Sequence, residues 1–309
     1  MKISGFTIIR NATKYYFPVK ESILSILPIV DEFIVALGDC DENDNTREVI
    51  ESINSPKIKI FDRIWDKELF VDGHIFRDET TFALNQCSGD YCFYLQADEV
   101  VHENDLDCIV NNCQNFIDDT EVEGFLFNYN HFWGDYDHYL YHHGWYQNEI
   151  RLVRNNIGIK SFGDAQSFRF DKNRRLNVVQ LPAQIYHYGW VRPPQLMVEK
   201  KEEQDSMHHG AKDGNNTDEI KTKIVYDYGP LGRLPIFKET HPKVMNELIQ
   251  NLNWQQHLNY GKILELTRSL NKHEKLKYRI ITWLEQKLFG GQHLFGYSNW
   301  NLLKRKQAQ

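Results

Sequence analysis

The chain has 309 residues, 41% of them hydrophobic and 26% charged, so it can bury the core of one large or two small domains. Its net charge of −7 excludes bulk nucleic-acid binding, because no basic excess exists to neutralise phosphates. No apolar run has the length of a membrane span, and the five cysteines are expected to be reduced thiols, so we expect a cytoplasmic protein. The basic tail at residues 304–306 is expected to be a solvated terminus and leaves peripheral membrane contact open.

The first hundred residues alternate between strand-like and helix-like segments. Short apolar runs predict strands at residues 3–9, 33–37, 57–61 and 91–95. Helical spacing of apolar residues fills the intervals, at residues 23–30, from Thr46 to residue 53, and at 74–87. This alternation predicts an α/β fold with a mostly parallel, doubly wound, Rossmann-like sheet.

Polar residues follow three of these predicted strands directly. Arg10 and Asn11 follow the first strand, Asp39 follows the second, and Gln96 and the adjacent carboxylates Asp98 and Glu99 follow the fourth. In open parallel sheets ligands bind beyond the carboxyl ends of the strands, so we expect these side chains at one crevice. Carboxylates there can hold a divalent cation, although an ordinary acidic turn would show the same pattern.

The second hundred residues have a different character. They predict a helix at residues 105–117 and strands at 124–130, 149–154, 167–170 and 185–190. Residues 127–146 are dense in Phe, Tyr, Trp and His. Aromatic rings stack on sugars and also pack in cores, and the sequence leaves both interpretations open.

The remaining chain is predicted to contain a mobile loop and a helical region. Residues 205–218 combine glycine, asparagine and charge without apolar periodicity, which is typical of a loop or lid. From residue 241 the spacing is helical. We therefore expect a catalytic domain at 1–200, with a donor half at 1–101 and an acceptor half at 102–200. A connection at 201–240 and a helical C-terminal region at 241–309 complete the chain.

The ordered set of polar residues at the predicted strand ends resembles that of the family 2 glycosyltransferases of the GT-A fold. The residues that carry the resemblance are Arg10-Asn11, Asp39, Asp44-Asn45-Thr46, Gly89-Asp90 and the segment LQADEV, within residues 3–195. The resemblance implies that Asp39 recognises the nucleotide base. It also implies that Asp98 binds a divalent metal, Mn or Mg, on the donor diphosphate. Gln96 departs from the family pattern, because an aspartate is common at its position.

The same resemblance implies a reaction and its remaining residues. It implies inverting transfer from a nucleoside diphosphate sugar, with a UDP-sugar as the expected donor. The acceptor would be a hydroxyl of a glycan or glycolipid, in cell-surface polysaccharide biosynthesis. His187 is the expected late metal ligand, and Arg10, Asn11 and Gln96 are expected to contact the donor. The catalytic base is Glu149 or Asp164, with a slight preference for Glu149.

Two other functions stay open. A sugar nucleotidyltransferase would need a basic, glycine-rich loop early in the chain, and residues 12–19 hold Lys14 but no glycine. A non-catalytic carbohydrate- or nucleotide-binding protein of the same fold is suggested by Gln96.

Overall fold

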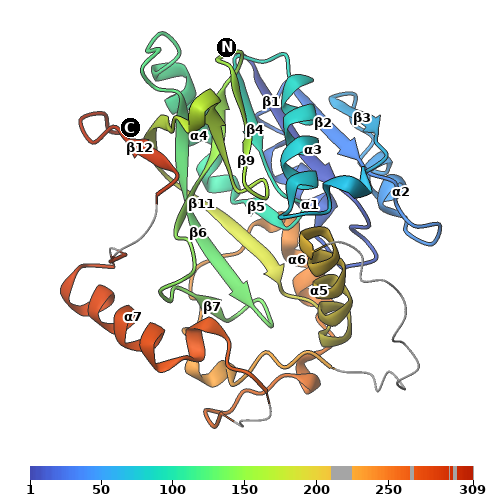
Figure 1. The fold of residues 1–309 in the computed structure, drawn as a ribbon, viewed down its shortest axis with the longest axis vertical. Coiled ribbons are helices and arrows are strands. Elements are labelled where there is room, and N and C mark those ends of the chain that lie inside the picture. Colours follow the sequence, from blue (N-terminus) through green and yellow to red (C-terminus); the bar gives the residue numbers. More distant parts are fainter. Residues whose placement is uncertain (210–224, 265–267, 292, 295–297, 309) are drawn as a thin grey trace.

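The computed structural model describes residues 1–209, 225–264, 268–291, 293–294 and 298–308. It is an α/β protein in which helices cover both faces of one curled sheet (Figure 1). The main path through this sheet runs β12-β11-β6-β8-β4-β1-β2-β3. The predicted α/β class and mostly parallel, doubly wound sheet are confirmed.

The N-terminal half supplies a parallel block of four strands and three helices. The strands are β1 (Ile3–Ile9), β2 (Glu32–Leu37), β3 (Ile58–Asp62) and β4 (Tyr91–Tyr94). The helices are α1 (Val19–Ile26), α2 (Thr46–Glu51) and α3 (His74–Asn85). β1 pairs in parallel with both β2 and β4, and β2 pairs in parallel with β3. Their carboxyl ends therefore meet at one edge of the sheet.

Two layers of helices cover this block. Ile23 of α1, Ile50 of α2 and Ile109 of α4 (Leu106–Asn115) belong to one hydrophobic cluster. Ala83 and Leu84 of α3 belong to a second cluster, on the other face. All six residues of β2 are buried, as expected for a strand that is covered on both sides.

The second half of the sheet mixes parallel and antiparallel pairs. Its strands are β5 (Glu99–Val101), β6 (Gly124–Trp133), β7 (Tyr139–Leu140), β8 (Asn148–Arg154) and β11 (Leu176–Trp190). β8 runs antiparallel between β4 and β6, whereas β11 runs parallel to β6 and antiparallel to β5. β9 (Ile159–Phe162) and β10 (Ser167–Phe170) form a separate two-stranded sheet. β11 is much longer than the strand predicted at residues 185–190.

The C-terminal region is helical in part and also returns a strand to the sheet. It contains α5 (Pro194–His209), α6 (Asn246–Gln250), α7 (Leu276–Leu288) and β12 (Trp300–Leu302). β12, which pairs with β11, was not predicted. Residues 205–209 end a helix instead of forming the predicted loop, and residues 210–218 lie outside the described residues. Residues 263–264 are not helical. In the described part of the chain, no helix has the length and apolar character needed to traverse a bilayer.

Candidate active site

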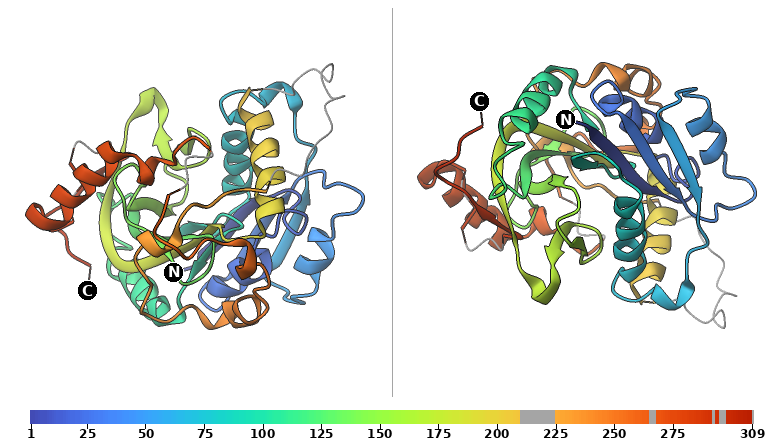
Figure 2. Two further views of the ribbon diagram at one scale, coloured as in Figure 1. Left: turned by 90° about the horizontal axis from the view of Figure 1, so that it is seen from below. Right: turned by 90° about the horizontal axis from the view of Figure 1, so that it is seen from above.

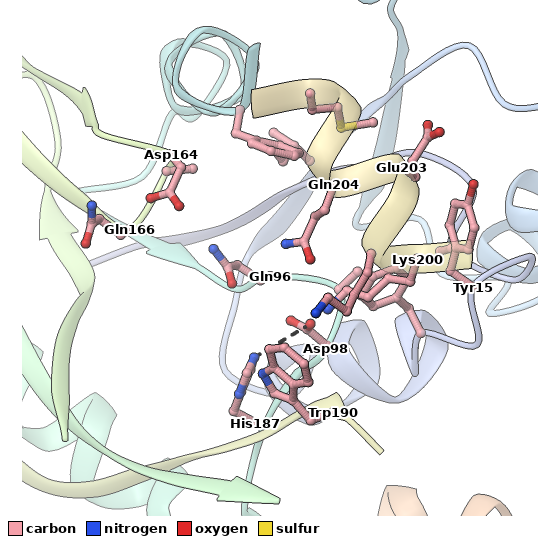
Figure 3. A pocket seen from close by; sticks show the side chains of 18 of the residues that line it. Tyr15, Gln96, Asp98, Asp164, Gln166, His187, Trp190, Lys200, Glu203 and Gln204 are labelled. Carbon is pink, nitrogen blue, oxygen red and sulfur yellow. Dashed lines mark ion pairs between the residues drawn. The ribbon is translucent and has the colours of Figure 1, made fainter. Parts of the chain in front are cut away.

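A cavity of about 650 Å³ lies beyond the carboxyl ends of β1 and β4 (Figure 3). Both halves of the chain line it. Its lining includes Arg10, Trp65, Gln96, Asp98, Trp145, Arg151, Asp164, His187, Trp190, Lys200, Asn271 and Lys272. Five of the predicted site residues, Arg10, Gln96, Asp98, Asp164 and His187, therefore come together at one cavity.

Asp98 and His187 face each other at the floor of the site. The pairing of β5 with β11 places His187 opposite Glu99, which brings its ring beside Asp98. The Nε2 atom of His187 lies 3.7 Å from Oδ2 of Asp98, and both side chains are buried. Burial would raise the pKa of Asp98, but His187, Lys200 and Arg192 outweigh it and hold that pKa well below its usual range. Asp98 is therefore ionised.

A second histidine fixes which nitrogen of His187 is free. His131 Nε2 lies 2.6 Å from the carbonyl oxygen of Tyr146, so this nitrogen must donate. Burial, with His187 beside it, lowers the pKa of His131 to about 3, so the ring is neutral and its Nδ1 must accept. Nδ1 of His187, 2.9 Å away, is then the donor. Only Nε2 of His187 remains to take a proton or a metal ion.

The Asp98–His187 pair fits a divalent cation as two ligands of a larger set. A carboxylate oxygen and an imidazole nitrogen with a fixed tautomer are suitable donors for Mn or Mg. Among the described residues no group of three His, Cys, Asp or Glu side chains could hold a metal ion. The remaining ligands would have to come from phosphate oxygens and water.

Two buried cations stand beside this pair. The ammonium group of Lys200 is 3.1 Å from the carbonyl oxygen of Gly189, and Lys200 is only 6% exposed. Burial, helped by the nearby charge of Arg192, lowers the pKa of Lys200 to about 7. Arg192 donates to the carbonyls of Tyr15 and Gly189. Figure 3 shows Lys200 reaching toward Asp98, so the cavity holds positive charge for an anionic ligand.

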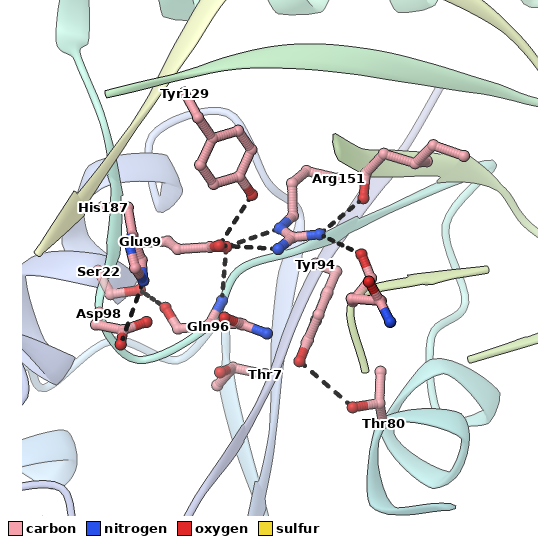
Figure 4. A network of polar contacts seen from close by, with 12 residues as sticks. Thr7, Ser22, Thr80, Tyr94, Gln96, Asp98, Glu99, Tyr129, Arg151 and His187 are labelled. Carbon is pink, nitrogen blue, oxygen red and sulfur yellow. Dashed lines mark hydrogen bonds and ion pairs between the residues drawn. The ribbon is translucent and has the colours of Figure 1, made fainter. Parts of the chain in front are cut away.

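A buried ion pair at the cavity wall connects the segments that carry Asp98 and Asp164 (Figure 4). Arg151 donates to both carboxylate oxygens of Glu99 at 2.8 Å. The same guanidinium donates to the carbonyl of Gln166, in the loop that carries Asp164. Glu99 thus faces the protein interior, although it neighbours Asp98, and its ion pair ties the Asp98 turn to the Asp164 loop. Removing one partner would leave an uncompensated buried charge.

The predicted nucleotide-recognition residues lie at one side of the cavity. Arg10 lines it, donates to the carbonyl of Asp39 and contacts the carboxylate of Glu203. Asp39 does not line it; its carboxylate accepts from the backbone of Trp65, whose indole does. Asn11 is buried and accepts from the backbone of Asp41. Asn11 therefore orders the loop around Asp39 without facing the cavity.

The two base candidates occupy different environments. Asp164 lies in the exposed loop between β9 and β10 and lines the cavity. Glu149 is 4% exposed, does not line the cavity, and interacts with Asn299 next to β12. Burial raises the pKa of Glu149 to about 8, so its carboxyl group is protonated at neutral pH. The geometry therefore does not support the preference for Glu149, whereas Arg151, two positions later on β8, does line the cavity.

Indole rings form part of the cavity wall. Trp145 and Trp190 line it, and their ring centroids are 5.7 Å apart. The indole nitrogens of Trp65 and Trp145 are buried and have no hydrogen-bond partner among the described residues. The apolar faces of such rings suit a sugar ring. The aromatic stretch at 127–146 thus contributes both to the cavity wall, through Trp145, and to the core, through Phe127 and Phe132.

Sequence reasoning missed Lys200, His131 and Arg151. Lys200 lies in a run of lysines and glutamates that is typical of a solvent-exposed helix, so nothing marks it as buried. His131 lies in the aromatic stretch without a distinguishing pattern. Arg151 follows Glu149 by two positions on β8, and nothing in the sequence shows which of the two reaches the cavity.

No family model matches this chain, and no curated protein does. Several solved structures are similar to part of it. S. aureus TarS shows 20% identity over 41% of this chain and 21% of its own, with a TM-score of 0.32. Glucosyl-3-phosphoglycerate synthase from Mycobacterium tuberculosis, solved with Mn2+, UDP and phosphoglyceric acid, shows 16% identity over 41% and 42%, with a TM-score of 0.28. Mannosyl-3-phosphoglycerate synthase from Rubrobacter xylanophilus shows 18% identity over 42% and 41%, with a TM-score of 0.30.

The chain spans about a fifth of TarS and about two fifths of the two synthases. These likenesses cover less than half of the present chain.

Proposed function

We propose that this protein is a glycosyltransferase of the family 2 type, which uses a nucleoside diphosphate sugar, expected to be a UDP-sugar. One observation carries the proposal: a single cavity joins the Asp98–His187 pair, the buried Lys200 and a wall of indole rings. An anionic diphosphate matches the cation and the metal pair, and a sugar matches the aromatic wall.

Each residue has a role in this reaction. The base and ribose would lie by Arg10 and Trp65, with Asp39, 41% exposed, accepting from a ring N–H. Gln96 would contact the donor through its amide. A bound Mn or Mg would act as a Lewis acid on the diphosphate. Asp98 and His187 would hold that ion.

The transfer itself needs a base and a stabilised leaving group. Asp164 would take the proton of the acceptor hydroxyl while the new bond to the anomeric carbon forms and the bond to the diphosphate breaks. Direct displacement of this kind inverts the anomeric centre. The diphosphate leaves with the electron pair, and the ammonium group of Lys200 stabilises its negative charge electrostatically.

The structure disfavours a sugar nucleotidyltransferase as the alternative. That chemistry needs an early cation at the triphosphate, whereas the ammonium of Lys14 is 2.5 Å from Asp41 and Lys14 does not line the cavity.

The decisive experiment is a thermal-shift titration with UDP and Mn, separately and together. We expect UDP and Mn together to raise the melting temperature by about 5 °C near a hundredfold excess over the dissociation constant. This shift should exceed the sum of the shifts that UDP and Mn give separately. Asp98→Asn should abolish the synergy, and Asp107→Asn, on α4 and outside the cavity, should retain it. Equal shifts in wild type and Asp98→Asn would contradict the metal-pair assignment. A wild type that neither binds UDP nor turns over any sugar nucleotide would contradict the proposed function.

A further inference from the structure

Helix α7 presents an apolar stripe to solvent. Leu276, Ile280 and Trp283 are 69%, 52% and 58% exposed. Their spacing of four and three residues places them on one face of the helix. Leu288 and Phe289, 66% and 47% exposed, extend the apolar surface at its end. Figure 2 shows the helix at the periphery of the molecule.

The opposite face fixes α7 to the loop before β8. Thr282 accepts from the backbone of His143 at 2.9 Å, and the buried Glu285 lies 2.8 Å from the ring of His143. Tyr278 packs against Gly144, where an added Cβ would come within 3.0 Å of the ring. The orientation of the helix, with its stripe outward, is therefore set by specific contacts.

The charges around the stripe all have one sign. Between residues 272 and 288 the exposed charged side chains are Lys272, Lys275, Lys277, Arg279 and Lys287. The two glutamates of this segment, Glu274 and Glu285, are buried. Three of these cations lie on α7 and two lie just before it, in a chain whose net charge is −7. Apolar residues that include Trp, flanked by Lys and Arg, are the composition of a helix that lies in a membrane interface.

We propose that α7 docks this protein on an anionic lipid surface. The apolar stripe would enter the boundary between headgroups and acyl chains, and the five cations would face anionic headgroups. A second copy of this chain is a poor occupant, because two-fold pairing of this face would set the same cations against each other.

Docking in this way would place the cavity at the membrane. Gly144 and Trp145, which belong to the loop that holds α7, line the cavity, and so do Asn271 and Lys272 just before the helix. The acceptor would therefore be the hydroxyl of a lipid-linked glycan. This conclusion on the acceptor rests on the proposed function, whereas the docking itself does not.

The test is flotation of the full chain with vesicles, without donor or metal. The vesicles are pure phosphatidylcholine, or phosphatidylcholine with phosphatidylglycerol. We expect at least tenfold tighter binding to the anionic vesicles, weakened by salt, since each cation near such a surface contributes about fivefold. Trp283→Glu should weaken binding at least tenfold, and the double variant Lys277→Glu/Arg279→Glu should remove the preference for anionic lipid.

Ile64→Glu is the matched control, because Ile64 is 84% exposed and follows β3, which lies on the opposite side of the molecule from α7 (Figure 1). It should leave vesicle binding unchanged. Wild type that stays unbound on anionic vesicles, or Trp283→Glu that binds like wild type, would overturn the proposal. A concentration-dependent dimer that Trp283→Glu dissociates, without vesicle binding, would assign the face to a second copy and overturn it as well. UDP-induced stabilisation, measured without vesicles, tests the catalytic function separately.

Discussion

The two ends of the parallel sheet treat buried charge in opposite ways. At the amino ends, one oxygen of Glu32 accepts from the hydroxyl and backbone N–H of Ser88, at 2.8 and 2.7 Å, and from the hydroxyl of Ser4 at 2.7 Å. Its other oxygen pairs with Lys59 at 2.6 Å. This carboxylate is saturated by the protein itself.

At the carboxyl ends, several polar groups are buried without that saturation, in contrast to the fully paired Glu99. Lys200 has three N–H groups and one hydrogen bond, to a carbonyl, among the described residues. The indole nitrogens of Trp65 and Trp145 and the Nε of Arg192 have no partner in the described part of the chain. Buried groups of this kind are costly unless a ligand satisfies them. The saturated end is therefore expected to contribute stability, and the unsaturated end to contribute binding and catalysis.

The largest expected effect is on the transfer step. We predict that Asp164→Asn lowers kcat by about a hundredfold or more, as is typical for loss of a general base, while the melting temperature and donor affinity stay near wild type. The reason is that Asp164 is exposed at the cavity and, within the described part of the chain, belongs to no buried network. Rates with a saturating sugar nucleotide, beside thermal unfolding, measure both quantities.

Glu149→Gln is the matched comparison for that variant. Glu149 is protonated and buried away from the cavity, and glutamine has nearly its shape, so we expect kcat within about threefold of wild type. If Glu149→Gln is inactive and Asp164→Asn is active, the assignment of the base reverses.

The strand-end residues were predictable because their positions follow from local sequence. A short apolar run bounded by polar residues marks both the strand and its end, and parallel pairing then brings Arg10, Gln96 and Asp98 to one edge. His187 was found through the family resemblance, and the structure places it beside Asp98.

The other half of the cavity depends on long-range packing that a single sequence does not record. β12 joins the sheet more than a hundred residues after β11 begins. The burial of Lys200 depends on how α5 packs. The register of β8 against β6 shifts next to Arg151, which the sequence does not indicate. In the sequence, the apolar stripe of α7 has the spacing of an ordinary buried helix face. Only the structure shows that this face is exposed to solvent.

An intermediate effect, on the affinity for UDP, is expected for substitution of Lys200. Lys200→Met should weaken UDP binding by about ten- to a hundredfold, because a hydrogen bond to a charged group contributes about 1.5–3 kcal/mol. The pKa of Lys200 is lowered to about 7, so above that pH a proton must be taken up when the diphosphate binds. Wild-type affinity should therefore fall as pH rises from 7 to 9, by at most tenfold per unit.

Binding isotherms across that pH range measure this dependence. Lys200→Met should give a flatter profile, and Lys67→Met, at an exposed lysine, should match wild type. A wild-type affinity that does not change from pH 7 to 9 would remove Lys200 from the diphosphate site.

The smallest effect is expected at the saturated end, and it is on stability. Burial alone would raise the pKa of Glu32, but Lys59, Ser4 and Ser88 outweigh it and lower that pKa to about 2. A carboxyl group with a depressed pKa in the folded state stabilises the protein above its ordinary pKa near 4.5, and the stabilisation is lost as pH falls toward 2. Glu32→Gln should therefore lower the free energy of unfolding at pH 7 by about 1–3 kcal/mol, with UDP affinity unchanged. In urea unfolding, the difference in free energy of unfolding between Glu32→Gln and wild type should narrow as pH falls from 4.5 to 2.

The control is Glu51→Gln, at an exposed i,i+4 pair with Arg47, which should change the free energy of unfolding by less than about 0.5 kcal/mol. A Glu32→Gln variant as stable as wild type at pH 7 would show that the saturated network is not what stabilises this end of the sheet.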